Sequence, residues 1–297
     1  MRRNLIVWAA TMPIISAIAV ATPASARSAE IVLEPSTLWN VDYGDEKCRL
    51  ARLFGEGEDK TILFMEQWGP DERFGFSVAG PAFNRFRSRS KTEIKFFDQR
   101  VAFETEPFTG DVEGFGRAVI HANFSLGNGN EFSREIGEVQ YGLPQIETEI
   151  AKQAKYVAFK QGNRTVKLET GPLHEAFTVL NQCSHQRLVD WGLDLDKHLT
   201  IKQMPLWRNE KKIAGQIASI YPTRALREGE SAIFRMRVLV NEDGSISDCK
   251  IYESTITEAL QSPACDKMKG AEFDPALDAE GRPVKSFYQT TIIYRVN

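Results

Sequence analysis

The stretch IYPTRALREGESAIFRMRVLVNEDG, residues 220–244, decides the fold of the last quarter of the chain. It predicts a very short helix, entered through a proline and closed by a glycine, and then a strand over 232–240. The even positions of that strand are apolar, whereas the odd positions include Arg235 and Arg237, so we expect a strand with one buried face. Residues 241–244 predict a hairpin turn that ends on a glycine able to take positive φ.

The sequence after this turn continues the same folding unit. A return strand is expected over 245–253, and Ser262 followed by a proline predicts the start of a second helix, which Gly270 closes. A last strand is expected over 286–296. The order of helix, hairpin, helix and strand indicates an α+β domain over residues 217–297.

Short motifs in this unit resemble the TonB C-terminal domain family, in the family's order and at fitting spacings. They are Tyr221-Pro222-x-x-Ala225-Leu226, Gly229, Val240-Asn241-x-Asp243-Gly244, Glu253-Ser254, Leu260, Phe273-x-Pro275-Ala276 and Gly281-x-Pro283-Val284. The resemblance implies a two-layer periplasmic domain that works by binding and not by catalysis. It implies as partner an outer-membrane TonB-dependent receptor, and also inner-membrane motor proteins, in energy transduction to the receptor.

The same resemblance implies that the last strand captures a receptor segment as an added strand. An exposed edge presents unpaired N–H and C=O groups that a peptide can pair with. In this chain the edge would run over 288–296. The candidate binding residues are Tyr221, Pro222, Tyr288, Thr290, Ile292 and Tyr294. The alternative is an edge that is blunted or covered, as most edges are.

The first 26 residues predict a cleaved signal peptide. Two arginines precede the uncharged stretch 5–21, and Ala24-Ser25-Ala26 is a small-residue cleavage site. We therefore expect export to the periplasm, with an inner-membrane anchor through 5–21 as the alternative. This segment has no histidine and no Pro-rich spacer follows it, in contrast to family transducers, and Ala218-Ser219-Ile220 replaces the Gln-Pro common before the Tyr-Pro motif. The alternative function is a periplasmic scaffold or small-ligand-binding protein that reuses the fold without coupling to the proton motor.

The charge balance argues against a nucleic-acid partner. Without residues 1–26, 35 basic and 40 acidic side chains remain. We expect no basic run and no Arg-rich face in the mature chain, and therefore no nucleic-acid binding.

Four cysteines would meet an oxidising compartment, and sequence alone does not choose among their three pairings. Pairing within domains favours Cys48 with Cys183 and Cys249 with Cys265. Zinc binding is the alternative, but the chain has no Cys-x-x-Cys motif.

Residues 28–206 predict a separate β-rich domain. Short Phe-rich runs at 61–65, 74–78, 93–97, 100–105, 118–126 and 156–159 alternate with Gly, Pro, Asn and Asp. They favour a mainly antiparallel sandwich or partial barrel, followed by one helix over 172–191. Residues 207–216 are expected to be the linker to the last domain.

No active site is expected in this chain. The histidines are His121, His174, His185 and His198, and no two of them have the spacing of a metal site. We therefore predict no catalytic residue, no metal and no cofactor. A clustered His–acid–Ser constellation in the β-rich domain would be needed to indicate a hydrolase.

Overall fold

The structure is a computed structural model, which describes residues 29–98, 102–127, 142–221, 223–253, 255 and 260–296. The expected signal peptide and the candidate residue Pro222 lie outside these ranges. Within them, no helix is long and apolar enough to cross a membrane.

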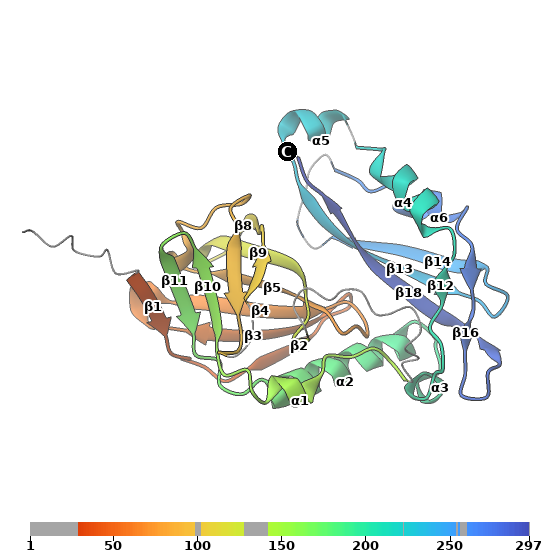
Figure 1. The fold of residues 1–297 in the computed structure, drawn as a ribbon, viewed down its shortest axis with the longest axis horizontal. Helices are drawn as coiled ribbons and strands as arrows, with labels where there is room; N and C mark the ends of the chain where they lie inside the picture. The colour runs from red at the N-terminus through yellow and green to blue at the C-terminus, as the bar shows by residue number, and fades with distance from the viewer. Residues whose placement is uncertain are drawn as a thin grey trace, which may run out of the picture.

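Two sheets form the N-terminal unit (Figure 1). In spatial order, the first sheet has β1 (Ala29–Leu33), β11 (Arg164–Leu168), β10 (Val157–Gln161), β6 (Thr92–Lys95) and β7 (Phe103–Thr105). The second has β2 (Asn40–Tyr43), β3 (Cys48–Phe54), β4 (Thr61–Gln67), β5 (Phe74–Ala79), β9 (Gly116–Phe124) and β8 (Phe108–Val112). All neighbours are antiparallel except β1 and β11, which run parallel. The expected antiparallel β-rich fold is confirmed.

A Phe-rich core lies between the two sheets and against helix α2 (His174–Asp190). Phe76 from the second sheet meets Phe159 from the first, with ring centroids 5.8 Å apart. Phe177 of α2 packs on Phe74 at 5.0 Å. A disulfide between Cys48 of β3 and Cys183 of α2 fastens the helix to the second sheet.

Short elements complete this unit. They are the 3₁₀ turns η1 (Gly57–Asp59) and η2 (Pro81–Phe83), and the helices α1 (Thr148–Ala151) and α3 (Leu195–Leu199).

The C-terminal unit is built on a three-stranded antiparallel sheet in the order β14-β13-β18. Strand β13 (Ala232–Val240) is central, between β14 (Ile246–Glu253) and β18 (Ser286–Tyr294). Helices α4 (Glu210–Ala218) and α6 (Ala264–Met268) lie along one face (Figure 1), where their apolar side chains share a core with the even residues of β13. Helix α5 (Thr223–Glu228) precedes β13. The short pairs β12 (Leu206–Trp207) with β15 (Phe273–Asp274) and β16 (Ala276–Leu277) with β17 (Pro283–Val284) flank the sheet.

The range 207–216, which the sequence predicts as the linker, has regular structure. Most of it is helix α4, and Trp207 and Ile213 belong to the core of the C-terminal unit. The reason is the spacing of Ile213 and Ile217, four residues apart, which places both on the face of α4 that meets the sheet. The boundaries at 206 and 217 stay predictions.

The expectation of a single buried face on β13 is wrong, because the N-terminal unit covers the other face. Leu239 of β13 and Phe287 of β18 are buried in a cluster with Leu188 and Trp191 from the end of α2. The Trp191 and Phe287 rings lie 5.3 Å apart. The sheet is therefore enclosed by helices on its even face and by the N-terminal unit on its odd face.

Candidate strand-binding edge

Strand β18 forms one outer edge of the C-terminal sheet. It pairs with β13 from Ser286 to Tyr294 and with no other strand of the described residues. In the described part of the chain, no main-chain hydrogen bond outside the sheet ladder involves this strand. Its outer side therefore offers main-chain donors and acceptors to a partner.

Two side-chain hydrogen bonds show which residues of β18 point outward. The Ile233 N–H donates to Thr255 Oγ1 at 3.0 Å, and Thr255 follows β14, so the odd residues of β13 direct their main chain toward β14. The even residues of β13 then face β18. At the other side of the same pair, the Val296 N–H donates to Ser231 Oγ at 3.1 Å, which turns the even residues of the last strand toward β13.

The outward donors and acceptors follow from this alternation. In an antiparallel sheet the N–H and C=O of one residue point to the same side, and successive residues alternate. The residues of β18 that present their main chain to the open edge are Phe287, Gln289, Thr291 and Ile293. The sequence could not show this phase, because it is set by the pairing register of β18 with β13.

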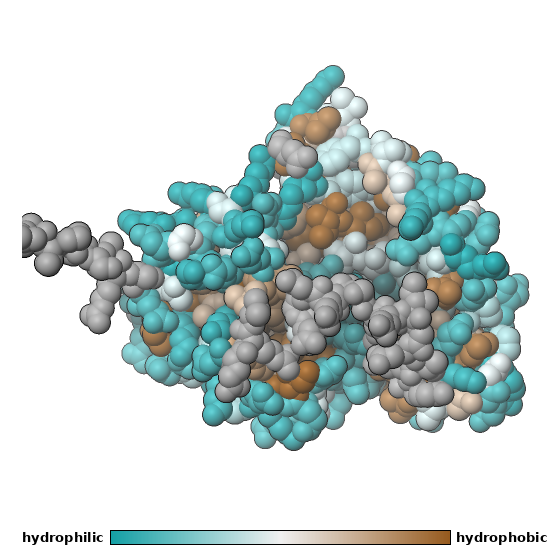
Figure 2. Space-filling model, viewed as in Figure 1, coloured by the Kyte–Doolittle hydropathy of each residue, from teal (hydrophilic) through white to brown (hydrophobic). Residues whose placement is uncertain are grey.

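The open edge carries no charge and is partly apolar. β18 reads SFYQTTIIY, without Asp, Glu, Lys or Arg. Ile293 is 47% exposed, and Figure 2 shows hydrophobic surface between the two units, where Figure 1 places β13 and β18. Natural proteins protect edge strands with charged side chains, and β18 has none.

The aromatic residues that the sequence analysis named turn into the core of the C-terminal unit. Tyr288 lies between Trp207 and Phe273, with ring centroids 5.5 and 5.4 Å away, and burial raises its pKa to about 12. Tyr294 is 4% exposed and meets the Tyr221 ring at 5.4 Å.

These aromatic contacts hold the strand in place from the inside. Thr290 and Ile292 are half-buried on the same even face. Tyr221 donates a hydrogen bond from its hydroxyl to the Glu230 carbonyl. A direct contact of these side chains with a partner stays a prediction.

Arg235 of β13 is the main polar link between the two units. Its guanidinium donates to the Asn123 Oδ1 at 2.7 Å, to the Ala122 carbonyl and to the Thr291 hydroxyl, and it lies 4.4 Å from the Trp68 ring. Burial lowers the pKa of Arg235 to about 10, so it stays charged at neutral pH. Buried charges of this kind need several hydrogen bonds, and Arg235 obtains them from both units.

The turn after β4 approaches β18 closely. Gln289 donates from its side chain to the Pro70 carbonyl at 2.6 Å. A Cβ atom at Gly69 would lie 2.3 Å from the Trp191 ring and 2.8 Å from the Gln289 side chain, so only glycine fits. Arg237 extends the contact, with its guanidinium 5.0 Å from the Trp191 ring and paired to Asp248.

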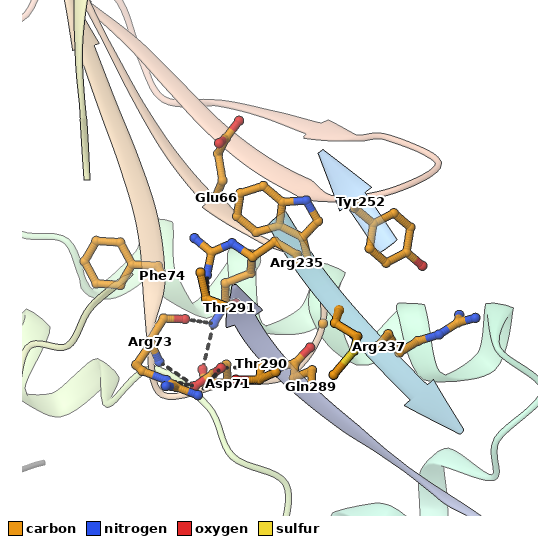
Figure 3. Close-up of a pocket in the computed structure, with 14 residues that line it drawn as sticks. Glu66, Asp71, Arg73, Phe74, Arg235, Arg237, Tyr252, Gln289, Thr290 and Thr291 are labelled. Carbon is orange, nitrogen blue, oxygen red and sulfur yellow. Dashed lines mark hydrogen bonds and ion pairs between the residues drawn. The ribbon is translucent and has the colours of Figure 1, made fainter. Parts of the chain in front are cut away.

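A small cavity remains between the units at this contact. Figure 3 shows Asp71 and Arg73 of the N-terminal unit and Arg235, Gln289 and Thr291 of the C-terminal unit around it. Its volume is about 30 Å³, which leaves room for water molecules. The cavity is therefore too small for an organic ligand.

A buried Ser–His pair joins α3 to the start of β18. His198 Nε2 lies 2.9 Å from Ser286 Oγ, and its Nδ1 lies 2.6 Å from the Asp194 main-chain carbonyl. The exposed fraction is 1% for His198 and 0% for Ser286, so a substrate cannot reach either group. A carbonyl replaces the carboxylate that a catalytic triad would place at Nδ1. The pair positions β18 and does not have the geometry of a hydrolase site.

The opposite edge of the sheet is fastened covalently. Cys249 of β14 and Cys265 of α6 form a disulfide with Cα atoms 5.6 Å apart. With Cys48–Cys183, these are the two pairs that the sequence analysis favoured.

Comparison with known proteins gives one match. Residues 218–296 match the family described as Gram-negative bacterial TonB protein C-terminal. No curated protein and no solved structure matches the chain. The matched range contains the whole β14-β13-β18 sheet, including the charge-free edge. The C-terminal unit is therefore a TonB C-terminal domain, joined in this chain to a β-rich N-terminal unit.

Proposed function

We propose that this protein captures an extended segment of an outer-membrane TonB-dependent receptor as a fourth strand along β18, in TonB-type energy transduction at the periplasmic side. The observation that carries the proposal is the outer edge of β18, where Phe287, Gln289, Thr291 and Ile293 present unpaired main-chain groups on a strand without charged side chains of its own. Main-chain pairing of this kind supplies affinity, and side-chain pockets supply specificity.

The support from the N-terminal unit strengthens the proposal. Strand addition requires an edge whose geometry is already formed, because ordering a mobile strand costs conformational entropy at the moment of binding. β18 is held from its odd face through Gln289 and Thr291 and from its even face through Tyr288 and Tyr294. The edge is thus preorganised between two packed faces.

A small-ligand site at the contact between the two units has weaker support. The space between the units has a volume of only about 30 Å³. A strand-binding role needs no enclosed pocket, because the partner lies along the edge.

The experiment is a titration of the full chain with a synthetic TonB-box peptide of an outer-membrane receptor, followed by calorimetry. We expect saturable binding to the parent protein and to Ile293→Val, which keeps the outward N–H. We expect at least tenfold weaker binding of Ile293→Pro, which removes that donor from the open edge. Equal binding of the Val and Pro variants would contradict strand addition at this edge.

A second variant covers the case in which the proline disturbs the fold. Ile293→Lys places a charge on the edge without changing the main chain, and the side chain is already half-exposed. If Ile293→Lys keeps its thermal unfolding midpoint and still binds as the parent does, the proposal is overturned.

A further inference from the structure

The loop between η2 and β6 concentrates positive charge. It reads Arg85-Phe86-Arg87-Ser88-Arg89-Ser90-Lys91, with a cation at every second position and no acid. It lines a surface depression of about 620 Å³ together with the Gln161-Gly162-Asn163-Arg164 turn. The expectation that the chain has no basic run is therefore wrong, because the nearly balanced total charge conceals this local cluster.

The main chain of the loop is fixed by one side chain. Gln161 accepts from the Arg87 N–H at 2.8 Å and donates to the carbonyls of Arg87 at 3.0 Å and Ser90 at 3.2 Å. It also donates to the Thr92 hydroxyl at 2.9 Å. The loop is thus a built surface whose shape does not depend on a ligand.

The apolar residues of the same segment anchor it from below. Phe83 and Phe86 are fully buried, with ring centroids 5.0 Å apart. Phe86 is buried and the neighbouring Arg87 is exposed, so the loop is anchored in the core while this guanidinium stays at the surface.

Three guanidinium groups in the depression have no acidic partner. Arg85, Arg87 and Arg164 are exposed, and none forms an ion pair with a residue that the structure describes. The acids near the rim already have partners. Glu104 pairs with Lys91 at 3.2 Å, and Glu93 pairs with Lys160 at 2.8 Å.

The basic loop also contacts the end of the candidate edge. Arg89 donates to the Val296 carbonyl at 2.6 Å, two residues after β18 ends. Arg295 pairs with Glu106 of the N-terminal unit at 3.5 Å. The basic loop therefore lies beside the C-terminal end of β18.

We propose that this depression binds phosphate groups on an anionic lipid surface. Guanidinium groups bind phosphate through paired, charge-assisted hydrogen bonds. Three guanidiniums without an acidic partner among the described residues can engage several phosphates, although Arg87 also donates to the Asn84 carbonyl at 3.2 Å. The depression is open, so it would leave a small free anion largely in solvent, whereas a lipid surface presents many phosphates at once. The chain as a whole has a formal charge of −3, so attraction to anions must come from this local cluster.

The test is co-sedimentation of the full chain with vesicles of phosphatidylcholine alone or with phosphatidylglycerol added. We expect binding only to vesicles with phosphatidylglycerol, falling as salt is raised. The triple variant Arg85→Gln/Arg87→Gln/Arg164→Gln should lose at least tenfold in partitioning, since each cation near an anionic surface contributes about 1 kcal/mol.

A matched control distinguishes the effect of the local basic cluster from the effect of the total charge of the protein. Lys202→Gln/Lys211→Gln/Lys212→Gln removes three exposed cations elsewhere and should bind as the parent does. Equal loss in both triple variants, or equal binding to neutral vesicles, would overturn the proposal. Tight binding of soluble tripolyphosphate with no vesicle binding would assign the site to a free phosphate compound and would also overturn the lipid surface. None of these outcomes depends on peptide capture at β18.

Discussion

The two outer strands of the C-terminal sheet differ in how their edges are protected. β14 reads ISDCKIYE, with three charged side chains, and its Cys249 is tied by a disulfide to α6. β18 reads SFYQTTIIY, with no charge, and its outward main-chain groups have no partner among the described residues. Charged residues are typical of an edge that must not pair, so the difference favours β18 over β14 as the edge for the proposed partner strand.

The largest expected effect is a difference in stability between proline substitutions at inward-facing and outward-facing N–H groups of β18. Ile292→Pro removes an N–H that pairs with Phe234 and places a proline inside the ladder, so we expect a loss of about 3 kcal/mol or more in the free energy of unfolding. Ile293→Pro removes an outward N–H and should cost much less. Urea unfolding of both variants tests the alternation, and equal destabilisation would show that the assigned phase is incorrect.

The disulfide on β14 should affect stability without affecting the candidate site. Replacing Cys249 and Cys265 with alanine opens a loop of sequence separation 16, for which we expect a loss of about 3 kcal/mol. Peptide binding at β18 should stay unchanged at a temperature where the variant is folded. Loss of binding in the folded variant would mean that the two edges are not independent.

The covered face of the sheet depends on Arg235. Arg235→Lys keeps the charge but cannot reach Ala122, Asn123 and Thr291 together, so we expect a loss of about 2 kcal/mol. The exposed Arg227→Lys is the control and should be neutral. Chemical unfolding measures the loss, and limited proteolysis should cut more readily between the units of the Arg235 variant.

Acid should destabilise the N-terminal unit through His121. This residue precedes Ala122, is buried against Phe76 at 4.7 Å, and burial lowers its pKa from 6.5 to about 3. Because the folded state disfavours the protonated ring, its contribution is complete above pH 6.5 and is lost as the pH falls toward 3. His121→Leu should flatten the stability profile in this window, and an unchanged slope in thermal unfolding against pH would contradict this assignment.

The smallest expected effect is that of removing a single charge from β14, the edge at which we expect no partner strand. Lys250→Thr on β14 should leave peptide affinity within about 0.5 kcal/mol of the parent value, because the partner does not meet that edge. A gain of affinity at β14 would show that its charges were the only protection there. Calorimetry with the same peptide distinguishes an unchanged affinity from a gain of affinity.

Local signals in the sequence were enough to predict the sheet of the C-terminal unit. Alternation over 232–240 and the turn at 241–244 gave β13 and the hairpin, and the expected last strand matches β18 to within two residues. These features depend on neighbours in the chain, which is why the sequence contains them.

The features that were missed depend on residues far apart in the chain. The buried environment of Arg235 is created by Trp68 and Asn123, more than one hundred residues earlier, so the alternation within its strand alone predicts a free polar face. The outward phase of β18 depends on its pairing register with β13, a strand about fifty residues earlier. The net charge does not reveal the basic depression, because acidic residues elsewhere in the chain balance its cations.

The most direct test of strand capture is residue-resolved amide hydrogen exchange of the full chain, with and without a saturating TonB-box peptide. The outward amides of Thr291 and Ile293 should become protected on binding, while Cys249 and Ile251 on β14 should exchange as before. Protection confined to β14, or bound peptide with no change at Thr291 and Ile293, would contradict the account.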